Sequence, residues 1–119
     1  MNAEAKDVLA AFNFGPDPEA NRSVGELVGE ILKSWPGRWE DKSDPRAHHE
    51  AKLLMLSTAK AKRELHWQPT WKFETAIART VEWYRGVNEN AAAAEPLTLR
   101  QIVEYEAAAR AANIMWATT

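Results

Sequence analysis

The sequence of 119 residues contains no cysteine, which excludes disulfides, cysteine-based zinc sites and thiol nucleophiles. No apolar run approaches the roughly 20 residues that a membrane-spanning helix requires, and the first residues lack the layout of a signal peptide. With 15 basic and 17 acidic residues, the net charge of −2 leaves no basic excess for binding DNA or RNA. These absences predict a single cytoplasmic domain that binds neither nucleic acid nor a membrane.

The few glycines are placed so that the common nucleotide-binding loops are excluded. A dinucleotide site needs closely spaced glycines, which let backbone N–H groups approach a pyrophosphate at the start of a helix. No GxGxxG, GxxGxxG or P-loop pattern can be assembled from the five glycines of this sequence. The chain itself is therefore expected to hold no NAD or other dinucleotide cofactor.

Hydrophobic periodicity predicts a first helix over residues 23–35. Ser23 and Glu26 form a capping box, in which each side chain can bond the backbone N–H group of the other residue. Pro36 and Gly37 are expected to end the helix. Its apolar residues recur at helical spacing and form one stripe, at Val24, Leu27, Val28, Ile31, Leu32 and Trp35.

Three further helices are predicted. One covers residues 58–65 with Ser57 as its cap, and the next covers residues 73–87 with a strong apolar stripe. The last opens with a second capping box, from Thr98 to Gln101. The alanine run 91–94 predicts a linker or a frayed helix end.

Three short segments have the pattern of strands. In residues 11–14, small or polar residues alternate with aromatic ones. Residues 38–41 are expected to form a short strand with Trp39 facing inward, and residues 53–56 are continuously apolar. With the helices they predict a mainly helical α+β fold of about four helices and two or three short strands. Strands this few form no large sheet alone, so the domain is expected to pack against something else.

Tryptophan is abundant, with six in 119 residues. Stacking on a sugar or a base is one interpretation. The other, favoured for four of them, is that large rings at helix ends and corners seal a small core; these are Trp35, Trp67, Trp71 and Trp83. Trp39 stays open between the two interpretations, and Trp116 is expected to be either exposed or buried against a partner.

The most polar loop, residues 42–51, contains Arg46, His48, His49 and Glu50. Neighbouring histidines on a loop rarely point the same way, and the spacing of a zinc-binding helix is missing, so no metal site is predicted. The loop is either a solvated surface or a face toward an anionic ligand, with Arg46 and His49 as donors to phosphate oxygens.

Six motifs remain to be interpreted together, and they are Ala11–Pro16, Arg22–Val28, His49–Ala51, Leu56–Ala61, Leu65–Pro69 and Phe73–Tyr84. In this order they resemble the C-terminal substrate-binding part of extended short-chain dehydrogenases that act on nucleotide sugars. The segment His49–Ala51 resembles in particular that of the CDP-glucose 4,6-dehydratases, which are NAD-dependent lyases of O-antigen sugar biosynthesis.

The resemblance covers about residues 11–105. It implies that residues 1–119 form a single C-terminal substrate-binding subdomain, with the Rossmann domain that binds NAD absent. It also implies that the parent enzyme acts on CDP-glucose, and that Arg46, His49 and Glu50 face this nucleotide sugar as part of a lid.

The family's catalytic pair, a tyrosine with a lysine four residues later, is missing from this chain. Four residues after Tyr84 stands Asn88, and four residues after Tyr105 stands Ala109. No catalytic residue is therefore predicted, and the chain is interpreted as a fragment or a truncated product that has no dehydratase activity alone.

One departure from the family pattern concerns backbone geometry. His66 stands where the family has the glycine that ends the helix, so a left-handed or strained helix end is predicted there. The alternative to a substrate-binding part is a stand-alone helical module that associates with itself. Without a Rossmann partner, the surface near residues 11–14 would be uncovered, which favours a homo-oligomer.

Overall fold

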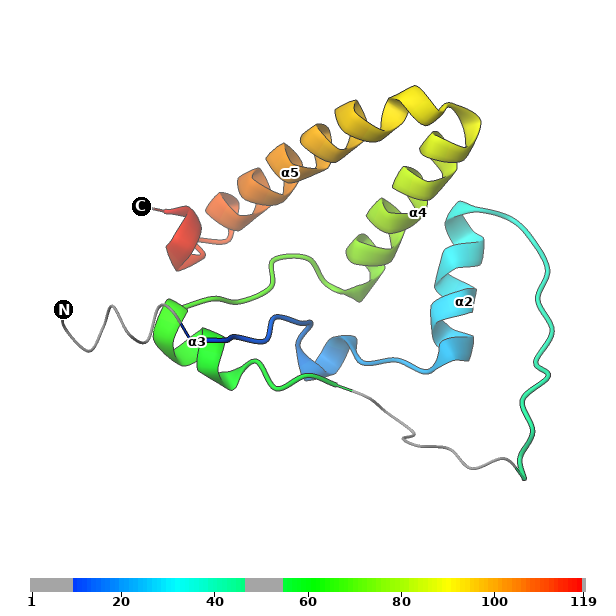
Figure 1. The fold of residues 1–119 in the computed structure, drawn as a ribbon, viewed down its shortest axis with the longest axis horizontal. Coiled ribbons are helices and arrows are strands. Elements are labelled where there is room, and N and C mark those ends of the chain that lie inside the picture. The colour runs from blue at the N-terminus through cyan, green and yellow to red at the C-terminus, as the bar shows by residue number, and fades with distance from the viewer. Residues whose placement is uncertain (1–9, 47–54, 119) are drawn as a thin grey trace.

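The computed structural model describes residues 10–46 and 55–118, and these residues form helices without a β-strand (Figure 1). The predicted strands are therefore absent from the described residues, and the α+β expectation is wrong there. The α-helices are α2 Val24–Ser34, α3 Ala59–Leu65, α4 Phe73–Glu89 and α5 Ala94–Ala111. Short 3₁₀ helices lie at η1 Pro18–Ala20, η2 Ala91–Ala93 and η3 Met115–Ala117.

The strand predictions fail because no backbone hydrogen bond among the described residues joins a candidate segment to another one, as a β-ladder requires. Residues 11–14 pack through their rings instead, with Phe14 edge-on to Trp67 at 5.2 Å. Residues 38–41 belong to an extended segment that arches away from the helices (Figure 1). Of the third candidate, residues 53–54 lie outside the described residues, and residues 55–56 are exposed.

Helix α2 begins where the capping box predicts. The Ser23 hydroxyl accepts a hydrogen bond from the Glu26 backbone N–H at 3.2 Å, which satisfies one of the open donors of the first turn. The Glu26 carboxylate turns to Arg22 at 3.4 Å and to the Ser23 hydroxyl at 3.4 Å. The bond from the Glu26 N–H to the Ser23 side chain is therefore present, whereas the reciprocal bond from the Ser23 N–H to the Glu26 side chain is not among the described contacts.

Helix α3 ends at a residue in the left-handed region, as predicted. His66 has φ of 53° and ψ of 30°, and the following N–H, that of Trp67, donates to the carbonyl of Ala61 at 3.2 Å. The helix begins one residue later than predicted, with Thr58 in place of Ser57 as the N-cap and without a capping bond from its side chain.

Helix α5 begins four residues before its predicted start. The Asn90 side chain accepts from the Ala92 N–H at 3.1 Å, and the alanine run then continues through η2 into α5. Thr98 lies inside the helix, where its hydroxyl donates to the Ala94 carbonyl at 2.7 Å. The prediction that Thr98 caps this helix is therefore wrong, because Pro96 fits the first turn and does not break it.

Helices α4 and α5 form an antiparallel hairpin (Figure 1). Near its closed end the helices approach so closely that a Cβ atom on Gly86 would lie 2.6 Å from Leu97 Cδ1. The indole N–H of Trp83 donates to the Thr98 hydroxyl at 2.9 Å, which joins the helices farther along. Helix α2 packs on the other side of α4, and Arg85 donates to the Ser34 carbonyl at 3.0 Å.

Glu82 on α4 is the centre of the polar contacts between α4 and α5. Its carboxylate accepts from Gln101 at 3.2 Å, pairs with Arg79 at 3.3 Å and contacts Arg100. Gln101 also donates to the Arg79 carbonyl at 2.8 Å. Partial burial alone would raise the pKa of Glu82, but the bonds from Gln101 and Arg79 and the two positive charges outweigh it and hold that pKa below its ordinary value.

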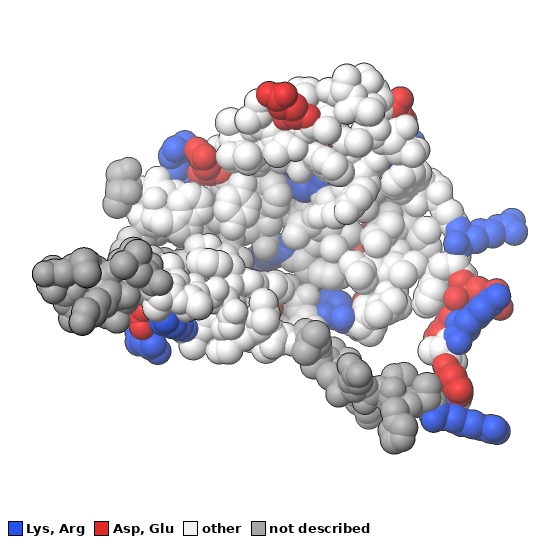
Figure 2. All heavy atoms as spheres, viewed as in Figure 1, with Lys and Arg blue, Asp and Glu red and all other residues white. Residues whose placement is uncertain are grey.

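The hydrophobic core is small for a chain of this length. Among the described residues the buried apolar side chains are Ala61, Val81, Ala109 and Ile114, and no large side chain is fully buried. The exposed surface is 9418 Å², against about 6,500 Å² for a compact protein of this mass. Figure 2 shows few charged side chains over the middle of one face, where uncharged groups dominate.

The tryptophans follow the corner interpretation only in part. Trp67 and Trp71 are half-buried beside helix ends, and Trp83 is half-buried inside α4. All three make ring contacts, whereas Trp35 and Trp39 are exposed. Large rings therefore close the turns of this fold, but they do not seal a continuous core.

Replacing His66 with glycine is expected to raise the free energy of unfolding by about 1 kcal/mol, because glycine enters the left-handed region without a steric cost. Asn113, with φ of 55°, is the matched control. Asn113→Gly should gain less, since asparagine tolerates this region better than other residues. Urea unfolding monitored by circular dichroism measures both, and a loss of stability in His66→Gly would contradict the account.

The lowered pKa of Glu82 predicts a loss of stability in acid. The ionised form is favoured in the folded state, so its contribution is present above the ordinary glutamate value of 4.5 and is lost as the pH falls through the lower folded value. Glu82→Gln should therefore flatten the fall in melting temperature between about pH 5 and pH 3. Glu40→Gln, on a solvent-exposed pair with Lys42, is the control and should leave the fall intact.

Candidate functional site

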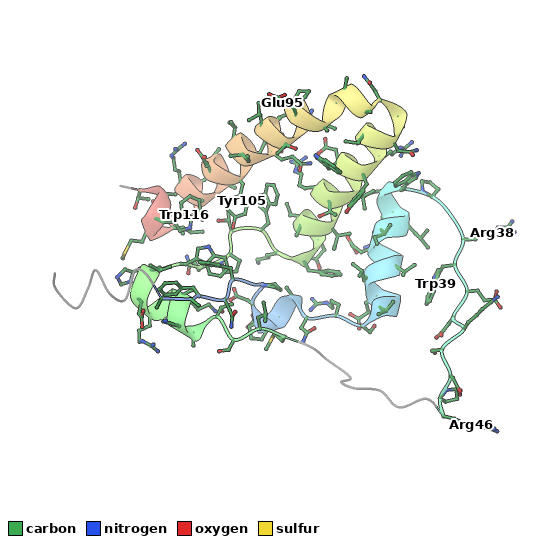
Figure 3. All side chains as sticks on the ribbon, in the orientation of Figure 1. Arg38, Trp39, Arg46, Glu95, Tyr105 and Trp116 are labelled. Atoms are coloured by element: carbon green, nitrogen blue, oxygen red, sulfur yellow. The ribbon has the colours of Figure 1, made fainter. Side chains whose placement is uncertain are left out.

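The predicted site residues are not brought together by the described structure. Arg46 ends the extended segment 36–46, and its side chain points away from the helices (Figure 3). Its backbone N–H donates to the Asp44 carboxylate at 2.8 Å. His49 and Glu50 lie outside the described residues. The prediction that these three residues face a nucleotide sugar therefore stays a prediction.

The extended segment 36–46 is shaped mainly by its own side chains. The Asp41 carboxylate accepts from the Ser43 hydroxyl at 2.5 Å and from the Ser43 N–H at 2.8 Å, and these two bonds lower the pKa of Asp41. Trp39 reaches back to α2, where its Cη2 atom lies 3.8 Å from the position of a Cβ on Gly25. Half of the Trp39 surface stays exposed.

A second place combines polar and aromatic groups. The loop before α2 and the loop before α4 enclose a hollow of about 610 Å³, which we call the polar hollow. Its charged side chains come from both loops and from the first turn of α4: they are Asp17, Glu19, Arg22, Lys72 and Glu74. Trp71 and Phe73 contribute rings, and Thr70 contributes a hydroxyl.

The two cations of the polar hollow differ in how firmly they are held. The Arg22 guanidinium lies 5.2 Å from the centre of the Phe73 ring, pairs with Glu26 and donates to the Glu19 carbonyl. Lys72 has no ion pair within the described part of the chain. An anionic ligand would meet one fixed donor in Arg22 and one uncommitted donor in Lys72.

Two further polar groups of the hollow, Thr70 and Asp17, affect what kind of ligand it can hold. The Thr70 hydroxyl oxygen is buried and has no hydrogen-bond partner among residues 10–46 and 55–118. Buried polar groups rarely stay unpaired, so this oxygen suits a ligand or a water molecule. Asp17 is partly neutralised by Lys62 at 2.7 Å, which lowers the cost of placing an anion near it.

An aromatic hollow of about 430 Å³ adjoins the polar one and shares Trp71 with it. Trp83, Ile102 and Tyr105 also line it. The Tyr105 ring lies edge-on to Trp71 at 4.9 Å and stacks with Trp116 at 6.0 Å, and Figure 3 shows Tyr105 and Trp116 at the same end of α5. The Tyr105 hydroxyl accepts from the Thr70 N–H at 3.1 Å, so α5 supports the loop that forms the polar hollow.

Two further properties bear on the kind of site. In the described ranges, no three histidine or carboxylate side chains gather closely enough to hold a metal ion. None of the helices in these ranges has the length and apolar character needed to cross a membrane.

The polar hollow is absent from the sequence-based prediction. Arg22 appears there only as the first residue of the motif Arg22–Val28, and Lys72 is not singled out. They are 50 positions apart in sequence, and only the packing of α2 beside α4 brings their loops together. The sequence carries one usable signal, which is that both residues lie at a helix start. Arg22 directly precedes the N-cap of α2, and Lys72 is the N-cap of α4.

Comparison with known proteins finds a distant relative. CDP-glucose 4,6-dehydratase of Salmonella typhimurium is 32% identical to this chain over 86 residues, which are 71% of this chain and 24% of the enzyme. The chain is therefore distantly related to this enzyme and spans about a quarter of its length. No protein-family model matches the chain. No solved structure matches it either.

Proposed function

We propose that this chain is the nucleotide-sugar-binding portion of a CDP-glucose 4,6-dehydratase and that the polar hollow takes the substrate. The observation that carries the proposal is the meeting of Arg22, Lys72 and the unpaired Thr70 hydroxyl in one hollow with two aromatic rings. The relation to CDP-glucose 4,6-dehydratase supports it independently.

The chemistry of a nucleoside diphosphate sugar corresponds to the groups of the hollow. The diphosphate needs cationic donors, which Arg22 and Lys72 supply. The sugar hydroxyls need acceptors and donors, which Glu19, Glu74 and Thr70 can provide. A volume of about 610 Å³ lies within the usual range of small-molecule sites.

The two tyrosines indicate that this chain binds the nucleotide sugar without converting it. Tyr84 is exposed on α4 and has Asn88 four positions later, where the catalytic tyrosine of the resembled family has its lysine. The Tyr105 hydroxyl accepts from the Thr70 backbone and supports the loop. In this proposal, hydride transfer and the binding of NAD belong to a part of the parent enzyme that this chain does not contain.

Arg46, His49 and Glu50 form a second candidate for the ligand contact. Their support is the sequence resemblance, and for Arg46 also the solvent exposure of its side chain. The polar hollow depends on Lys72 and the second candidate depends on Arg46, so replacing each cation in turn distinguishes the two sites.

Calorimetric titration of the 119-residue protein tests the proposal. CDP and CDP-glucose are expected to bind, whereas NAD is not. Lys72→Ala should weaken binding of CDP-glucose about tenfold or more, because a charge-assisted bond to phosphate is lost. Arg63→Ala removes an exposed charge on α3 and serves as the matched control with unchanged affinity.

The outcome for Arg46→Ala decides between the candidates. Unchanged affinity in this variant, with weakened affinity in Lys72→Ala, places the ligand in the polar hollow. The reverse pattern assigns it to the predicted lid and contradicts the hollow. Formation of a 4-keto-6-deoxy product from CDP-glucose and NAD by the purified chain would contradict the assignment as a binding portion only.

A further inference from the structure

The outer face of α5 carries an unusual exposure of apolar side chains. Leu99 is 56% exposed, Ile102 49% and Val103 65%, and their spacing of three and four positions places them along one side of the helix. Farther along the same helix, Ala107 and Ala111 are also exposed. This face therefore has bulky residues in its first half and small residues in its second half.

The contacts of α5 show which side of the helix is free. Thr98, Gln101 and Tyr105 are used against α4 and the loop before it. At 100° per residue, Leu99 and Val103 lie on the opposite side of the helix, and Ile102 lies at the edge between the two sides. No described segment covers this opposite side, as the position of α5 at the edge of the molecule shows (Figure 1).

The surface area indicates how much association the chain could support. The exposed surface is almost half as much again as the roughly 6,500 Å² expected for a compact protein of this mass. A stable interface between two proteins buries about 800 Å² on each partner. The exposed apolar side chains Leu99, Ile102 and Val103 contribute to this excess on the outer face of α5.

The charges on α5 favour one orientation of a second copy. Glu95 lies in the first turn and points outward (Figure 3), and Arg110 lies in the last turn, where it meets Glu106 at 3.5 Å. In a parallel pair of α5 helices, like charges would meet at both ends. In an antiparallel pair centred on Val103, Glu95 of each copy lies beside Arg110 of the other, and Leu99 of each copy faces Ala107 of the other.

We propose that two copies of this chain associate through their α5 helices, packed antiparallel with Leu99, Val103 and Ala107 in the interface. The pairing obeys two-fold symmetry, so each favourable contact occurs twice. The inference is independent of nucleotide-sugar binding, because no residue of this interface lines the polar hollow.

Chemical crosslinking tests the position of the two-fold axis. The chain has no cysteine, so a single introduced cysteine gives an unambiguous result. Val103→Cys is expected to give a covalent dimer with a short bis-maleimide at micromolar protein concentration. Arg63→Cys, on the exposed surface of α3, is the matched control and should stay monomeric on a denaturing gel. Equal yields from both variants would overturn the proposal.

Charge reversal tests the orientation, with sedimentation equilibrium as the measurement. Arg110→Glu and Glu95→Arg are each expected to weaken the dimer about tenfold, since each brings like charges together twice. The double variant should restore the affinity of the parent chain. If the single substitutions only destabilised the ends of α5, their effects would add in the double variant and the dimer would be weakened further. Circular dichroism, which measures the helix content, would then show a loss of helix.

Val103→Glu places two carboxylates face to face at the axis and should abolish the dimer. Val24→Glu changes an equally exposed valine on α2 and should leave it intact. A monomeric parent chain at 100 µM, or a dimer that survives Val103→Glu, would overturn the proposal.

Discussion

The packing of α4 against both α2 and α5 is the contact on which the other features of this structure depend. Val81 is the buried residue of α4, and Glu82 beside it collects Arg79, Arg100 and Gln101 into one polar bridge between α4 and α5. On the other side, Arg85 reaches the end of α2. With α4 fixed from two sides, the loops that precede α2 and α4 are held next to each other and enclose the polar hollow.

The small hydrophobic core leaves much apolar surface exposed to solvent. The few buried apolar residues leave broad apolar surface on α5 and around the ring contacts. A chain with so little burial gains stability when another surface covers it, whether a second copy, a bound ligand or the rest of a longer enzyme.

Local rules predicted part of the local structure, because they need only neighbouring residues. They failed at Ser57 and Thr98, neither of which caps its helix. Ser23 caps α2, and His66 takes the left-handed conformation that its place in a helix-ending motif requires. The strand at residues 11–14 failed because a strand needs a distant partner, which no local pattern shows. Arg22 and Lys72 were missed for the same reason, since their approach follows from the packing of α2 on α4.

Hydrogen–deuterium exchange with and without saturating CDP-glucose tests the central claim most directly. Amide exchange in the two loops of the polar hollow, residues 15–22 and 69–74, is expected to be slower when CDP-glucose is present. Slower exchange confined to residues 38–46, or no change anywhere in the chain, would contradict it.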